Sequence, residues 1–178
     1  MTTRVLVAYG TKYGATAEIA EKIGQVLRAA GLVVDVRRAN QAGDPAAYQA
    51  VVLGSAVYIG KWRKEAVRFL QDNEQTLARL PVWIFNSGPL GEGDAAEMAG
   101  EYGFPKGLRP ITDRIHPRDI MIFHGAVDLQ KLNPLERWMF KNVSSTVGDF
   151  RKWDAIAAWA NGIAVALEES PEVVAVAA

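Results

Sequence analysis

Short apolar runs alternate with longer segments of helical periodicity along most of this chain, and this alternation restricts the fold more than any other feature. Continuous apolar runs of strand length are typical of strands that are buried on both faces. Five such runs lie at 5–9, 32–36, 50–57, 82–86 and 120–124. Strands that alternate with helices predict an α/β fold, with a parallel sheet, helices on both faces and right-handed crossovers.

The segments between these runs place their apolar residues at helical spacing. Ile19, Ile23 and Leu27 recur on one face of the first segment, and Gly31 follows where a left-handed C-cap is favoured. Asp44-Pro45 is typical of an N-cap followed by proline at the first helical position. Further helices are expected over 66–77, which Pro81 follows, over 95–102, and from Trp153 through Ile156, Ala160 and Ile163.

A chain of 178 residues has the length of one ordinary domain. We expect that domain to span 1–170, with an extended segment at about 126–152. Residues 171–178 are expected to form a flexible tail.

Composition excludes several classes of function. The charges balance at 20 basic and 20 acidic residues, so a nucleic acid partner is not expected. There is no cysteine, which excludes disulfides, thiolate nucleophiles and iron–sulfur ligation, and with two histidines no metal site is expected. The chain shows neither a signal-peptide pattern at its start nor an uncharged apolar stretch of about 18 residues, which predicts a cytoplasmic protein.

The turn after the first predicted strand has the composition of an anion-binding loop. It contains Thr11, Lys12, Tyr13, Gly14, Ala15 and Thr16, directly before a helix. Backbone N–H groups at a helix N-terminus bind phosphate well. Glycines at 10 and 14 match neither the dinucleotide fingerprint nor a Walker loop. The alternative is a Gly/Thr capping turn without a ligand.

Two more turns should meet this loop, because parallel strands present their carboxyl ends at one edge of the sheet. The third strand leads into Ser55, Ala56, Val57, Tyr58, Gly60 and Trp62, and the fourth into Asn86, Ser87, Gly88 and Gly91. Small residues permit close approach of a planar ring, against which Tyr58 or Trp62 could lie. Taken singly, these aromatic residues are as well explained by packing.

These three loops resemble those of flavodoxins. The first is similar to their FMN phosphate loop, 54–58 to their second, ring-contacting loop, and 86–88 to the third. The resemblance covers residues 4 to about 167. It implies a flavodoxin-like three-layer sandwich, with a five-stranded parallel sheet in the order 2-1-3-4-5, and FMN as the cofactor, bound by the loop residues named above.

Three C-terminal stretches, 124–128, 131–138 and 148–153, resemble the menaquinone-dependent protoporphyrinogen IX dehydrogenase branch. This resemblance implies an FMN-dependent oxidoreductase whose partner is a quinone or a redox protein. The alternatives are a flavodoxin-type electron carrier and a scaffold without flavin. The region 91–105 departs from the branch, because Glu92, Asp94, Glu97 and Glu101 would repel an anionic porphyrin near the flavin.

The region 129–143 has an amphipathic pattern. Its apolar residues are Leu132, Leu135, Trp138, Met139 and Phe140, and its cations are Lys131, Arg137 and Lys141. Such a helix could contact anionic lipid at the membrane periphery. The alternatives are packing over the sheet edge or against a second copy in a homo-oligomer. Nearby, His124 could approach the flavin or pack, and Arg151 and Lys152 could bind a substrate carboxylate or neighbouring acids.

Overall fold

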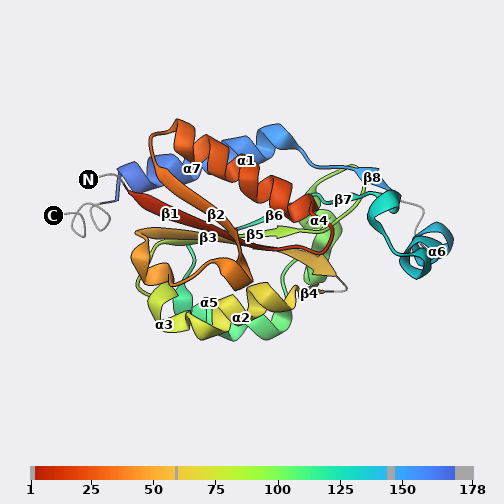
Figure 1. Cartoon of the computed structure of the whole chain (residues 1–178), viewed down its shortest axis with the longest axis horizontal. Coiled ribbons are helices and arrows are strands. Elements are labelled where there is room, and N and C mark those ends of the chain that lie inside the picture. Colours follow the sequence, from red (N-terminus) through yellow and green to blue (C-terminus); the bar gives the residue numbers. More distant parts are fainter. Residues whose placement is uncertain (1–2, 59, 144–146, 171–178) are drawn as a thin grey trace.

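The computed structural model describes residues 3–58, 60–143 and 147–170, so the tail expected at 171–178 lies outside the described residues. Its main sheet has parallel strands in the order β2-β1-β3-β5-β6 (Figure 1). These strands are β1 (Arg4–Gly10), β2 (Val33–Arg38), β3 (Ala50–Tyr58), β5 (Val82–Ser87) and β6 (Asp119–Phe123). The predicted α/β fold and strand order are confirmed, with β5 and β6 as the fourth and fifth predicted strands.

The strand that pairs with the end of β3 was not predicted, and neither were the two short strands beyond the main sheet, β7 (Ala126–Val127) and β8 (Gly148–Asp149). β4 (Lys61–Trp62) pairs antiparallel with the end of β3, through Val57 opposite Trp62 and Tyr58 opposite Lys61. A strand of two residues has no apolar run to reveal it. The fifth strand also ends one residue earlier than predicted, so His124 lies just beyond it.

Helices cover both faces of the sheet (Figure 1). One face carries α1 (Ala15–Ala29) and α7 (Trp153–Glu168), and the other carries α2 (Lys64–Asp72), α3 (Glu74–Leu77) and α5 (Arg109–Ile115). The helix predicted over 66–77 is thus two helices. α4 (Ala95–Ala99) lies beside β6. Short 3₁₀ turns are at Ala39–Gln41, Pro45–Ala47, Gly100–Tyr102, Lys106–Leu108 and Leu129–Lys131.

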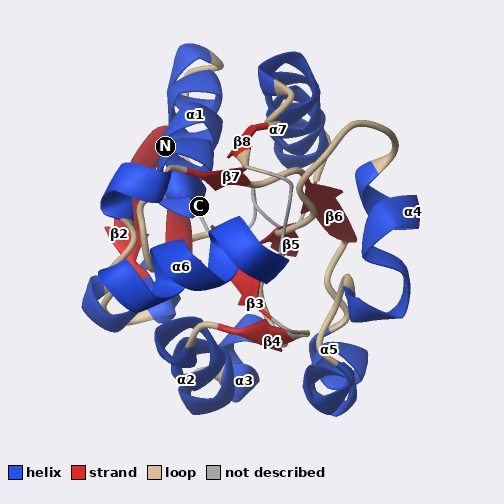
Figure 2. Ribbon diagram, turned by 90° about the vertical axis from the view of Figure 1, so that its right-hand side faces the viewer, coloured by secondary structure: helices blue, strands red, loops and turns tan. Residues whose placement is uncertain are grey.

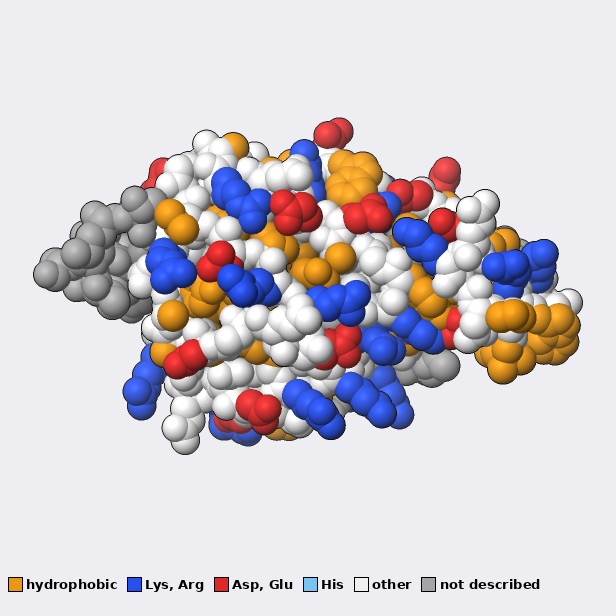
Figure 3. Space-filling model, in the orientation of Figure 1, with side chains coloured by type: hydrophobic (Ala, Val, Ile, Leu, Met, Phe, Trp, Pro, Cys, Tyr) orange, Lys and Arg blue, Asp and Glu red, His pale blue; other side chains and the backbone are white. Residues whose placement is uncertain are grey.

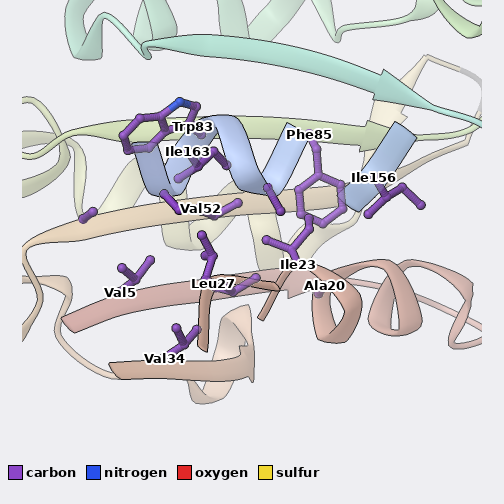
Figure 4. Close-up of a cluster of buried hydrophobic side chains, with 14 of the residues drawn as sticks. Val5, Ala20, Ile23, Leu27, Val34, Val52, Trp83, Phe85, Ile156 and Ile163 are labelled. Atoms are coloured by element: carbon purple, nitrogen blue, oxygen red, sulfur yellow. The ribbon is translucent and has the colours of Figure 1, made fainter. Parts of the chain in front are cut away.

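The continuous apolar strands produce a core on each face of the sheet. Val5, Val52 and Phe85 pack with α1 and α7 on one side (Figure 4). Leu6 and Leu53 pack with α2 and α3 on the other, because successive strand residues point to opposite faces. Of the residues predicted to pack α7 on the sheet, Ile156, Ala160 and Ile163 are buried, whereas Trp153 is exposed.

A glycine in β3 is required by close packing inside the sheet. A Cβ on Gly54 would lie 2.0 Å from Cζ of Phe85, which is on the neighbouring strand β5. The missing side chain leaves room for the Phe85 ring, which in turn packs against Trp159 of α7. The large aromatic residue therefore occupies the middle of this core without pushing the strands apart.

The region 126–152 lies beyond the carboxyl ends of the strands. It contains β7 (Ala126–Val127), α6 (Pro134–Val143) and β8 (Gly148–Asp149), and β7 pairs antiparallel with β8. Figure 2 shows α6 crossing in front of the strand ends. The described parts of this region therefore form a small second layer over the edge of the sheet at which the loops converge.

Candidate functional site

The loops after β1, β3, β5 and β6 line one cavity of about 260 Å³ at the carboxyl edge of the sheet. Nine of the predicted site residues line it: Thr11, Tyr13, Ala15, Thr16, Ala56, Val57, Tyr58, Ser87 and Gly88. The expectation that three separate loops meet at one place is therefore confirmed by the geometry. Burial raises the pKa of Tyr58, so its phenol is neutral beside the cavity at physiological pH.

The other predicted residues do not line this cavity: Lys12, Gly14, Ser55, Gly60, Trp62, Asn86 and Gly91. Ser55 is buried, and its hydroxyl accepts a hydrogen bond from Arg63 N–H and donates one to the Ala56 carbonyl. Trp62 is also buried, and its indole N–H donates to Asn86 Oδ1 over 2.6 Å. Of the two aromatic residues proposed to lie against a ring, only Tyr58 reaches the cavity.

The first loop is shaped by internal hydrogen bonds. Gly14 has a φ of 98°, a left-handed conformation that side chains disfavour, and its N–H donates to Thr11 Oγ1 over 3.0 Å. α1 starts at the next residue, so its first N–H groups have no partner within the helix. Thr16 is buried at the cavity wall. This arrangement can bind a phosphate group.

Five lining residues were missed in the sequence: Leu90, Gly125, Ala126, Val127 and Phe140. Gly125 follows the fifth strand, and a Cβ there would lie 3.2 Å from the Gly88 carbonyl oxygen. A glycine directly after a parallel strand was therefore an available signal. No sequence signal indicated Phe140, because it belongs to α6, which is far from the other lining loops along the chain.

Glu136 holds α6 to the first loop. Its carboxylate accepts hydrogen bonds from Lys12 Nζ and from the Tyr13 hydroxyl. These two bonds lower the pKa of Glu136 to about 2. Asn133 and Glu136 also cap the start of α6 reciprocally, with Glu136 N–H donating to Asn133 Oδ1 over 2.8 Å and Asn133 N–H to Glu136 Oε2 over 3.2 Å. The cap orients the carboxylate that contacts the loop.

Arg151 ties the other end of the segment to α1. Its side chain is 7% exposed, and it pairs with Asp149 at 2.6 Å and with Glu18 at 2.8 Å. It also donates to the Ala15 carbonyl over 3.1 Å. Hydrogen bonding to Asp149 raises the pKa of this guanidinium. Of the two interpretations of Arg151, the structure supports pairing with neighbouring acids.

His124 and Lys152 both contact the loop after β5. His124 is buried, and its Nε2–H donates to the Gly93 carbonyl over 3.1 Å. Lys152 Nζ donates to the same oxygen over 2.8 Å. These contacts favour the packing interpretation of His124 and give Lys152 a structural partner.

A doubly wound parallel sheet with a phosphate-type loop and two further loops at its carboxyl edge defines a nucleotide-binding α/β protein. A family model described as "Flavodoxin domain" matches residues 6–153, and the chain belongs to this family. Its cofactor is accordingly FMN. No curated protein matches the sequence.

Solved structures share the fold at low sequence identity. An archaeal flavodoxin has 14% identity and a TM-score of 0.63, with 93% of this chain and 99% of that chain covered. Flavodoxin 2 from Bacillus cereus has 22% identity and a TM-score of 0.59, with the same coverage. Rubredoxin oxygen:oxidoreductase from Desulfovibrio gigas has 14% identity and a TM-score of 0.60, with 94% of this chain and 36% of that chain covered.

The residues present fit FMN. Among the described residues, no side chain caps the start of α1, which leaves its first N–H groups for a phosphate, and Gly88 and Gly125 add no side chains to the cavity wall. In the described part of the chain, no group of three or more His, Asp or Glu residues is arranged to hold a metal ion. No helix among the described residues has the length and apolar character needed to cross a membrane.

Proposed function

We propose that this protein is an FMN-dependent oxidoreductase of the quinone-linked dehydrogenase type, with one domain over 1–170. The observation that carries the proposal is the single cavity that joins the first loop to the loops after β3, β5 and β6 and is bordered by Phe140 of α6. FMN bound there supplies the redox chemistry, and the protein supplies binding and orientation.

The residues have distinct parts in this proposal. The loop 11–16 binds the phosphate, with the buried hydroxyl of Thr16 at the wall. Val57, Tyr58 and Gly88 line the cavity, where Val57 and Gly88 would border the ring and Tyr58 would lie against one of its faces. Nothing in this arrangement requires a covalent nucleophile, which agrees with a chain that has no cysteine.

The exposed face of α6 has a composition that supports contact with a lipid surface, and the redox partner would lie in that surface. Leu135 is 66% exposed and Trp138 is 61% exposed, and the exposed cations Lys131 and Lys141 lie on the same segment. Figure 3 shows hydrophobic side chains gathered beside basic ones at the end of the molecule where Figure 1 draws α6. Apolar and cationic groups together suit anionic lipid. We infer that α6 rests on such a surface, where a quinone would be dissolved.

Titration with FMN tests the cofactor site. Thr16→Ala should weaken FMN binding by about 1–2 kcal/mol, because a hydrogen bond to a charged group is lost. Thr76→Ala in α3, away from the cavity, is the control and should leave binding unchanged. A colourless protein that also fails to bind added FMN would contradict the whole proposal.

Anaerobic turnover tests the proposal that this protein is an enzyme, with protoporphyrinogen as the electron donor and a quinone as the electron acceptor. Measurable oxidation supports a dehydrogenase of this type. Rapid electron exchange with a reductase protein, without turnover, would instead support the electron carrier.

Sedimentation with vesicles tests the surface contact. Binding to phosphatidylglycerol vesicles, but not to phosphatidylcholine, is expected, and Trp138→Ala should reduce it. A stable dimer that buries α6, without vesicle binding, would contradict the lipid contact.

A further inference from the structure

A second cavity, of about 340 Å³, adjoins the cavity assigned to FMN. The two share Val57 and Gly88 in their walls, but the second contains no residue of the first loop. One wall is formed by α4 and the following turn, and Figure 2 shows α4 beside β6. Its size falls within the usual range for small-molecule sites, about 300–1,000 Å³.

The wall of this second cavity is mainly apolar, and Asn86 is the one buried polar side chain among its lining residues. Met98, Ala99 and Ile122 contribute apolar surface, and Tyr102, which is 72% exposed, stands at the rim. None of the four acidic residues of 92–101 is in the lining. A wall of this kind favours an uncharged, mainly apolar ligand.

The orientation of the Asn86 side-chain amide follows from its hydrogen bond with Trp62. The indole N–H of Trp62 can only donate, so the Asn86 atom that it contacts is the carbonyl oxygen Oδ1. The amide nitrogen Nδ2 then points elsewhere, and within the described residues it has no hydrogen-bond partner although it is buried. Buried donors without a partner are rare and costly in folded proteins.

We propose that this second cavity binds a flat, uncharged molecule of one or two fused rings whose carbonyl oxygen accepts a hydrogen bond from Asn86 Nδ2. Apolar walls and one aimed donor are the features that orient such a ligand. The ligand would lie next to the cavity assigned to FMN, across Val57 and Gly88. Its role as a redox substrate rests on the proposed function, whereas its binding does not.

A pair of bicyclic probes tests the hydrogen bond. α-Tetralone carries a carbonyl group, and tetralin is the same fused-ring hydrocarbon without it. Titration calorimetry with the FMN-loaded protein should show tetralone binding about three- to tenfold tighter than tetralin. Tighter binding of the more apolar tetralin, or no binding of either, would overturn the proposal.

A substitution that fills the second cavity tests whether tetralone binds there. Ala99→Phe places a ring into the cavity and should weaken tetralone binding at least about tenfold. Ala96→Phe is the matched control, because Ala96 is on the same helix but exposed and outside the lining, and it should leave binding unchanged. FMN affinity should be the same in both variants. If Ala99→Phe weakens FMN binding as strongly, the cavity belongs to the flavin ring and the proposal is wrong.

The Asn86 side-chain amide gives a direct readout. In ¹⁵N spectra, tetralone should shift the Asn86 NH₂ signals, whereas tetralin should shift them much less. Unchanged Asn86 signals at saturating tetralone would overturn the assignment of the donor. Failure to bind FMN would overturn the proposed function but not this proposal. Tetralone can still be titrated into the protein without FMN, and that titration reports on the second cavity.

Discussion

Different forces hold the main sheet and the described part of the region 126–152. The sheet is held by apolar side chains buried on both faces, such as Phe85 and Ile23. The region 126–152 is held largely by polar contacts, through Glu136 to the first loop and through Arg151 to α1. Much of its apolar surface, including Trp138, faces outward.

Because of this difference, the stability of the sheet and access to the FMN cavity depend on different kinds of contact. Apolar burial depends little on salt or pH, whereas ion pairs near the surface depend on both. The loops that form the FMN cavity are therefore positioned by the sheet, and we expect the contacts of α6 to open without unfolding of the sheet. Four changes can test this separation.

Replacement of Phe85 should have the largest effect. Phe85→Ala leaves a hole between β5 and α7 and should lower the free energy of unfolding by about 3–5 kcal/mol in urea titration. Val165→Ala, at an exposed site on α7, should change it by about 0.5 kcal/mol or less. Equal losses in the two variants would show that the core is not the main source of stability.

Removal of Arg151 should loosen the segment more than it destabilises the sheet. Arg151→Ala should cost about 1–2 kcal/mol, because the guanidinium is buried while its two carboxylate partners are half exposed. Hydrogen exchange should accelerate in β7 and β8 and stay slow in β1. The control is Arg37→Ala, whose guanidinium is half exposed and 4.0 Å from Asp35, and it should change neither measurement.

Neutralisation of Glu136 should affect α6 alone. Glu136→Gln weakens the contacts to Lys12 and Tyr13, so amide exchange in α6 should accelerate several-fold with little change in thermal midpoint. Glu97→Gln in α4 is the matched control. A large drop in thermal midpoint for Glu136→Gln would mean that α6 is part of the cooperative core.

Acid should produce the smallest and most local change. The pKa of Glu136 is lowered in the folded protein to about 2, from an ordinary value of 4.5. Its contribution is therefore complete above about pH 4.5 and is lost as the pH falls toward 2. NMR signals of the Tyr13 ring should stay constant from pH 8 to about 4 and shift as the pH falls toward 2, because the folded protein titrates with the lowered pKa of Glu136. If the Tyr13 signals shifted with a midpoint near pH 6, a group other than Glu136 would be responsible for the change.

Prediction from sequence succeeded where the signal is local and failed where partners are distant. Apolar runs revealed the five parallel strands, and glycines with threonines revealed the first loop. The direction of the Trp62 side chain was not predictable, because it depends on Asn86, 24 residues away. Phe140 and Glu136 were likewise invisible as cavity and loop contacts, since they reach the first loop across more than 120 residues.

The sequence alone determined the alternation of strands and helices and the glycine- and threonine-containing first loop, and its resemblance to flavodoxins implied the strand order. The alternation and the first loop follow from side-chain periodicity and from the conformational freedom of single residues, which act over a few neighbours. Only the tertiary structure decided which cavity each loop residue faces, how Arg151 and Glu136 are paired, and that the Asn86 amide nitrogen has no hydrogen-bond partner among the described residues. Those outcomes depend on contacts between residues far apart in the chain, whose geometry no local pattern records.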